Sequence, residues 1–252
     1  MKFIILGSGS SMGVPRPDGF FGNCDPKNPK NFRTRCSALI KSKDINVLID
    51  TSPDLRIQML KNKIIKLDTV IYTHHHADQT HGINDLRVFF LKRKKEIPVY
   101  TDKNTKKYLL DSFSYCFEGS KEYPPLLRLF DIKKKFKLGK FITIESIKVK
   151  HGSIDSVSYI INKKIAYLPD ANEIYEKDYE KFFKLDYLVI DCLRFKFHPS
   201  HFNLDDVLKM NVDLKPKKLI LTNLHSDLDY DKLINILPKN TKPAYDGLTL
   251  NF

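Results

Sequence analysis

A run of histidines after an apolar segment is the feature of this chain that most limits its fold. Residues 68–72 read Asp-Thr-Val-Ile-Tyr, which predicts a buried strand, and residues 73–82 follow as Thr-His-His-His-Ala-Asp-Gln-Thr-His-Gly. Side chains on an extended backbone repeat every two residues, so His74, His76 and Asp78 are expected to point to one side. Imidazoles and a carboxylate that converge at one point can bind a transition metal. The pattern predicts a strand that ends at a metal centre.

Strands are predicted to alternate with helices along the whole chain. Expected strands cover 2–6, 37–40, 46–50, 97–100, 147–150, 164–168, 185–190 and 218–221, and expected helices cover 54–61, 82–92, 103–116 and 203–210. Polar groups follow several of these strands, namely His151, Asp170 and His225. In open α/β architectures, catalytic groups gather at strand ends. An α/β fold with its site at one sheet edge is therefore expected, although for His225 an incidental position is an equally good interpretation.

The length and charge of the chain limit the classes of protein that it can belong to. A chain of 252 residues is long enough for one large α/β domain. No apolar run approaches about 18 residues and the N-terminus lacks the pattern of a signal peptide, so a cytoplasmic protein without membrane contact is expected. The net charge of +13 favours anionic ligands. Nucleic acid is allowed as a partner but is not favoured, because the lysines are dispersed.

The order of these motifs resembles the metallo-β-lactamase-fold hydrolases. Within them the chain looks most like the phosphodiesterase branch related to the carbon–phosphorus lyase accessory enzyme that opens cyclic ribose phosphates. Besides the histidine run, the resemblance rests on residues 7–15 (GSGSSMGVP), 35–40 (RCSALI), 48–54 (LIDTSPD), 82–87 (GINDLR) and 244–247 (AYDG). It implies that residues 1–252 form a single domain, a four-layer αβ/βα sandwich. It also implies two divalent metal ions, zinc or manganese.

The resemblance also implies a set of metal ligands. One ion would bind to His74, His76 and His151, while Asp170 would bridge to a second ion. Asp78 would bind this second ion and act as a catalytic residue.

The chain departs from the family pattern at the second ion. Gln79 and Asn223 stand where the family has histidines. His225 and His81 are the candidate replacements; His81 would share a helical face with Asp78, three residues before it. Retention of the second ion is expected, although weaker binding or loss of this ion stays open.

Three further residues have expected roles around the metal centre. His201 is expected to contact the substrate phosphate and to act as a catalytic proton donor, and the alternative is a histidine bonded to backbone at a helix entry. Asp50 is expected to orient a ligand histidine from behind. Arg87 could bind substrate phosphate through its planar guanidinium, or could form a structural pair with Asp85 or Asp54.

The resemblance implies a hydrolase that cleaves a small cyclic or nucleotide-like phosphodiester with a water molecule that the ions activate. An RNA-processing nuclease of the same superfamily is one alternative. A non-catalytic nucleotide-binding relative, whose second metal position has decayed, is another. A homodimer is compatible with the resemblance.

Overall fold

Two β-sheets of seven strands each form the centre of the protein, which is described over residues 1–252 by a computed structural model. The first sheet has the order β14-β1-β2-β3-β4-β5-β6. Its strands are β1 (Lys2–Gly7), β2 (Ser37–Lys41), β3 (Asn46–Ile49), β4 (Thr69–Ile71), β5 (Ile97–Thr101), β6 (Leu127–Asp131) and β14 (Thr249–Asn251). Strands β3 to β6 run parallel to one another, so their carboxyl ends lie at one edge.

The second sheet has the order β13-β12-β11-β10-β9-β8-β7. Its strands are β7 (Lys135–Leu138), β8 (Ile142–His151), β9 (Ile154–Ile161), β10 (Ile165–Leu168), β11 (Tyr187–Asp191), β12 (Lys218–Thr222) and β13 (Thr241–Pro243). Strands β10 to β13 are parallel, while β7, β8 and β9 form an antiparallel meander. The side chains that follow β10, β11 and β12 are therefore brought to the same edge of this sheet.

Both faces of the first sheet are apolar, as the alternation of residues along β1 shows. Phe3 and Ile5 pack into the layer between the two sheets, together with Tyr159 and other residues of the second sheet. Ile4 and Leu6 point the other way and pack beneath helices. A sheet that is buried on both faces needs cover on its outer side, which explains why helices flank the sandwich.

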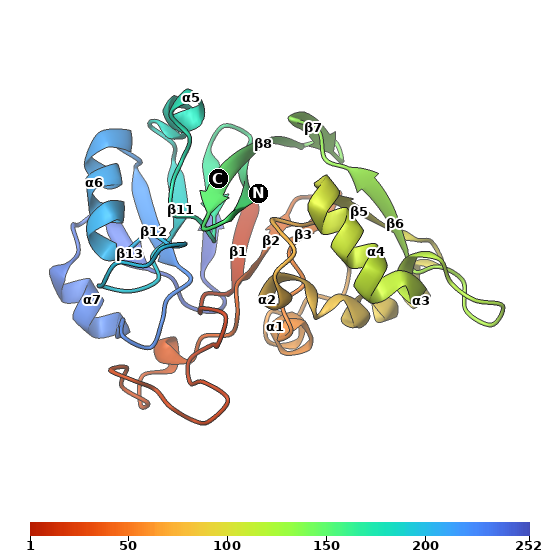
Figure 1. The fold of residues 1–252 in the computed structure, drawn as a ribbon, viewed down its shortest axis with the longest axis horizontal. Helices are drawn as coiled ribbons and strands as arrows, with labels where there is room; N and C mark the ends of the chain where they lie inside the picture. Colours follow the sequence, from red (N-terminus) through yellow and green to blue (C-terminus); the bar gives the residue numbers. More distant parts are fainter.

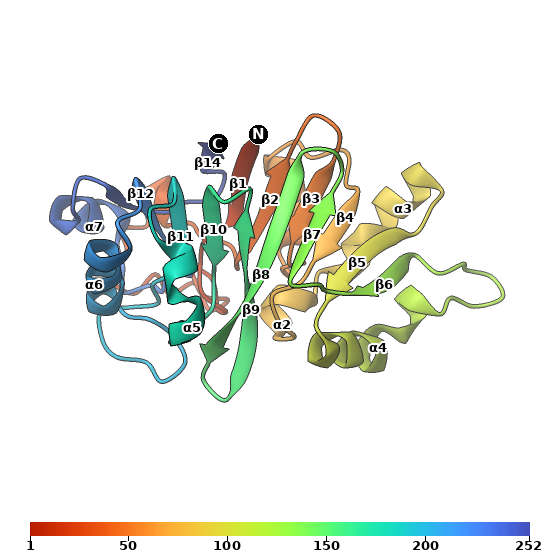
Figure 2. The same ribbon diagram turned by 90° about the horizontal axis from the view of Figure 1, so that it is seen from above.

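The helices form the two outer layers (Figures 1 and 2). The first sheet is covered by α1 (Leu55–Lys61), α3 (Arg87–Arg93) and α4 (Lys103–Phe117), and the second by α5 (Glu176–Tyr179), α6 (Leu204–Leu214) and α7 (Tyr230–Ile236). A one-turn helix, α2 (Ala77–Thr80), and the 3₁₀ turns η1 (Pro29–Asn31), η2 (Ile83–Leu86) and η3 (Glu180–Phe182) complete the elements. The predicted four-layer αβ/βα sandwich is confirmed.

One local prediction is wrong. The segment that carries the metal motif is extended only as far as His76, and α2 begins at Ala77, so Asp78 lies in the first turn of a helix. Asp78 reaches the site by this turn and not by strand alternation. No helix in the structure combines the length and the apolar character that crossing a membrane requires.

Candidate metal centre

Three histidines from two separate segments of the chain bring their ring nitrogens together. His74 follows β4, His76 is the N-cap residue of α2, and His151 is the last residue of β8. His76 Nδ1 lies 2.9 Å from Nε2 of His74 and 3.3 Å from Nε2 of His151. These three side chains form one of two groups in the protein whose ligand atoms are close enough to share a metal ion.

The contacts behind these rings determine which nitrogens carry hydrogen. His151 Nδ1 lies 2.7 Å from the carbonyl oxygen of Ser200, which only accepts, so Nδ1 carries the hydrogen and Nε2 presents a lone pair. Thr73 Oγ1 donates to Asp50 Oδ2 at 2.8 Å and accepts from His74 Nδ1 at 3.0 Å, so Nε2 of His74 is bare as well. Two lone pairs therefore face His76, whose Nδ1 can offer at most one hydrogen. This set of donors fits a metal ion.

The electrostatic surroundings keep these imidazoles neutral, as metal ligands must be. Burial, followed by the neighbouring imidazoles, holds the pKa of His74 well below its usual value. Burial and His201 lower the pKa of His151 to about 4. Burial lowers the pKa of His76 as well, although Asp78 partly opposes the shift. Near neutral pH all three rings can coordinate a metal without first losing a proton.

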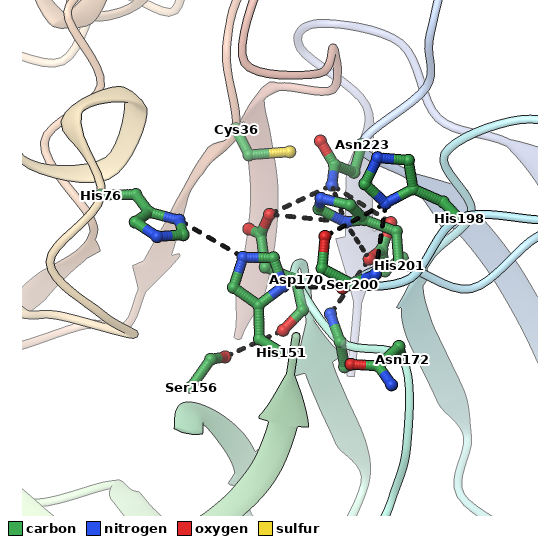
Figure 3. Close-up of polar contacts among 12 residues, drawn as sticks. Cys36, His76, His151, Ser156, Asp170, Asn172, His198, Ser200, His201 and Asn223 are labelled. Atoms are coloured by element: carbon green, nitrogen blue, oxygen red, sulfur yellow. Dashed lines mark hydrogen bonds and ion pairs between the residues drawn. The ribbon is translucent and has the colours of Figure 1, made fainter. Parts of the chain in front are cut away.

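A buried carboxylate, Asp170, lies beside this cluster at the end of β10 and is 3% exposed (Figure 3). Its Oδ1 accepts a hydrogen bond from Asn223 Nδ2 at 3.1 Å, and its Oδ2 accepts one from Gln79 Nε2 at 3.1 Å. Burial and the nearby Asp78 raise the pKa of Asp170 well above its usual value. Asp170 forms the second possible metal-binding group, together with His151 and His201.

His201 is held by a carboxylate that the sequence analysis did not identify. Its Nδ1 lies 2.6 Å from Oδ2 of Asp191, the last residue of β11, which is fully buried. Burial disfavours the charged form of His201, but Asp191 and then Asp170 outweigh it and raise the pKa of His201 to about 9. His201 is therefore an imidazolium near neutral pH, with its Nε2 left for a ligand.

His76, His151, Asp170 and His201 open into one pocket of about 330 Å³, a volume suited to a small molecule. Only Met12 and Leu193 of its lining residues are hydrophobic; the others are Ser10, Ser11, His76, Asp78, His151, Asp170, Arg194, His198, Ser200, His201, Asn223 and His225. Arg194 is fixed there by bonds to the carbonyl oxygens of Lys196 and Phe197. The pocket thus combines metal-binding groups with cationic side chains.

Two predicted site residues lie elsewhere. His81 directly follows α2 and is exposed, and its Nε2 lies 2.8 Å from the hydroxyl of Tyr108. The helix α2 makes only one turn and does not hold His81 on the face of Asp78. Arg87 lies on the outer surface with its guanidinium over the ring of Tyr123, and pairs with neither Asp85 nor Asp54. His81 is therefore not placed as a metal ligand, nor Arg87 as a phosphate-binding residue.

Two other predicted residues lie near the site, Asp50 behind His74 and His225 in the lining of the pocket. Asp50 accepts from the backbone nitrogen of Thr73 at 2.7 Å and from its hydroxyl, and thus reaches His74 through Thr73. His225 lines the pocket, and its Nδ1 has no hydrogen-bond partner, although Asp227 Oδ1 is 3.4 Å away.

Sequence reasoning missed Asp191, Arg194 and His198. Asp191 had a usable signal, because it ends a predicted strand as Asp170 does. Arg194 and His198 lie in the loop between β11 and α6, which has no periodic pattern.

A profile of the beta-lactamase superfamily domain matches residues 45–223, a range that includes the three histidines and Asp170. The chain belongs to the beta-lactamase superfamily. The converging imidazoles agree with the metal-dependent members of this superfamily. The metallo-β-lactamase-fold hydrolase expected from the sequence is confirmed.

Solved structures share this superfamily fold over their full length. A crystal structure described as a new diphosphatase from the PhnP family has a TM-score of 0.90 and 31% identity, and the match covers 100% of this chain and 97% of the other. Zinc-bound PqqB from Methylobacterium extorquens has a TM-score of 0.77 at 16% identity, with both chains fully covered. Human tRNase Z, short form, has a TM-score of 0.67 at 14% identity over 100% and 99% of the two chains. The last two likenesses concern the fold alone.

A curated relative named octanoyltransferase, from Porphyromonas gingivalis (strain ATCC BAA-308 / W83), is 34% identical over 256 residues. The match covers 98% of this chain and 51% of the relative. This chain therefore spans about half the length of that relative, and the name describes the longer protein.

Proposed function

We propose that this chain is a metal-dependent phosphodiesterase that hydrolyses a small cyclic or nucleotide-like phosphodiester. The observation that carries the proposal is that three neutral imidazoles suited to a metal adjoin a pocket that also holds an imidazolium, His201, fixed by Asp191. The likeness to a diphosphatase at 31% identity supports chemistry at phosphorus.

His74, His76 and His151 would hold the metal, with Asp170 beside them. Zinc suits three imidazoles, and manganese is the alternative. When bound, the ion would lower the pKa of water and offset negative charge on the phosphoryl oxygens. Proton donation and substrate binding would be carried out by side chains of this protein.

His201 would supply the proton that the leaving oxygen needs. Asp191 keeps the ring protonated and orients it, because Nδ1 is fixed at 2.6 Å and only Nε2 is left for the substrate. Arg194 would bind a non-bridging or terminal phosphate oxygen, since its guanidinium is held in the pocket by two backbone carbonyls. The small volume of the pocket favours a compact substrate over folded nucleic acid.

Turnover of bis(4-nitrophenyl) phosphate by zinc-loaded or manganese-loaded protein tests this function, with an acyl thioester and a β-lactam as competing substrates. The diester should be hydrolysed, and His74→Ala should abolish its hydrolysis after metal reconstitution. His81→Ala is the matched control, because this histidine bonds to Tyr108 outside the pocket. Hydrolysis of the thioester or lactam without hydrolysis of the diester would overturn the proposal.

A further inference from the structure

Two buried amides take up the carboxylate oxygens that a second metal ion would need. Gln79 is 0% exposed and Asn223 is 1% exposed. Gln79 Nε2 donates to Asp170 Oδ2 and to Asp78 Oδ2, each at 3.1 Å. Asn223 Nδ2 donates to Asp170 Oδ1 and to Asp191 Oδ1, again at 3.1 Å. Each amide group thus uses both of its hydrogens to join two carboxylates.

The two carboxylates determine the orientation of the Gln79 side-chain amide. Its Oε1 is buried without any hydrogen-bond partner, which is unfavourable for a polar atom. Turning the amide over would bring Oε1 to the two carboxylate oxygens, where it would be repelled unless a cation lay between them. The carboxylates of Asp78 and Asp170 therefore hold the nitrogen toward them and leave the carbonyl oxygen unpaired.

The three-histidine position has the opposite character. There, the Nε2 lone pairs of His74 and His151 both face His76 Nδ1, which has at most one hydrogen to donate. The position therefore lacks the positive charge that these two lone pairs would bind. Around Asp170, amide hydrogens already supply partial positive charge to both oxygens. The two candidate replacements for the missing histidines do not supply ligands for a second ion. His81 bonds to Tyr108, and His225 belongs to neither group of side chains that could share an ion.

We propose that this chain binds one metal ion, at His74, His76 and His151, and that the amides of Gln79 and Asn223 replace a second ion between the carboxylates. The expectation of two ions thus gives way to a single-ion centre in which both oxygens of Asp170 accept hydrogen bonds from the amides. The proposal concerns metal binding alone and does not depend on which substrate the protein hydrolyses.

Metal stoichiometry tests the proposal directly. The metal-free protein is titrated with Co²⁺ while its visible absorption is followed, and metal content is measured after removal of unbound ion. The titration should end at one equivalent, and one ion per chain should remain. Two equivalents bound with comparable affinity, or two ions retained, would overturn the proposal whatever the activity of the protein.

Substituted proteins show whether the amides are the cause. Gln79→His with Asn223→His restores imidazoles at both positions, and the doubly substituted protein should bind a second equivalent. His81→Ala and His225→Ala should each retain one ion. If the double variant folds, as judged by circular dichroism, and still binds one ion, the amides do not close the position and the proposal fails. If that variant does not fold, the stoichiometry of the unaltered chain decides.

Discussion

Asp191 holds His201 at 2.6 Å across the second sheet's edge, although neither residue belongs to the histidine run that announces the site. In the metal-free protein, the pKa of His201 is expected to be about 9 because the charge of Asp191 outweighs the effect of burial. Asp191→Asn removes that charge, so the pKa of His201 should fall, with Asp170 and Asp78 left to oppose the effect of burial. Titration of the imidazole carbon resonances by NMR measures this change. A pKa that stays near 9 in the variant would show that Asp191 is not the cause.

The same pair makes the stability of the metal-free protein depend on pH. The pKa of His201 is raised in the folded state, so the folded protein binds its proton more tightly than the unfolded chain does. This contribution is fully present below pH 6.5 and is lost as the pH rises to about 9. Urea unfolding across this interval should show a decline in the free energy of unfolding, and His201→Gln should reduce its slope. An unchanged slope in the variant would assign the decline to other groups.

Thr73 is predicted to tune metal affinity without touching the metal. Its hydroxyl accepts from His74 Nδ1 and donates to Asp50, which keeps Nε2 of His74 free for the ion. Thr73→Val removes this link, and zinc affinity should fall about 10–100-fold, as is typical when the partner of a ligand histidine is lost. Competition with a chromogenic chelator measures the affinity.

Thr69→Val is the matched control for this change. Thr69 begins β4, is equally buried, and its hydroxyl bonds to the carbonyl oxygen of Pro98 at 2.8 Å, away from the histidines. Its substitution should lower stability but leave zinc affinity unchanged. Equal losses of affinity in the two variants would mean that Thr73 acts only through general stability.

Local signals explain which parts of this architecture could be predicted from the sequence. Apolar runs such as 46–49 and 218–222 are continuous in the chain, so their strands were identified almost to the residue. His74, His151 and Asp170 were identified because each follows such a run. The pair formed by Asp191 and His201 could not be seen in the same way, because it depends on the path of the irregular loop between β11 and α6.

The position of His81 shows the limit of reasoning from spacing. Three residues separate it from Asp78, which would align both on a continuing helix. The helix α2 ends after Thr80, and the ring of His81 instead forms a hydrogen bond with the hydroxyl of Tyr108 on α4. The position of the His81 ring thus depends on a tertiary contact with a distant element, which the local sequence pattern does not encode.

Metal removal is expected to lower thermal stability through the three-histidine position. A ligand that binds only the folded state at about 100 times its Kd adds about 2.7 kcal/mol to the free energy of unfolding. Added zinc should therefore raise the Tm of the metal-free protein, and a chelator should reverse the rise. His151→Ala keeps the whole histidine run but removes the ligand from the second sheet, so its Tm should respond little. A full response in that variant would locate the stabilising ion elsewhere.

Two arginines provide a matched pair for substrate binding. Arg194 lines the pocket and is fixed by the carbonyl oxygens of Lys196 and Phe197, whereas Arg87 lies over Tyr123 on the outer surface. A charge-assisted hydrogen bond is worth about 1.5–3 kcal/mol, so Arg194→Ala should raise the KM for an anionic diester roughly 10–100-fold. Arg87→Ala should leave KM unchanged. Steady-state kinetics on one diester measures both variants, and a rise in KM confined to Arg87→Ala would move substrate binding to the outer surface.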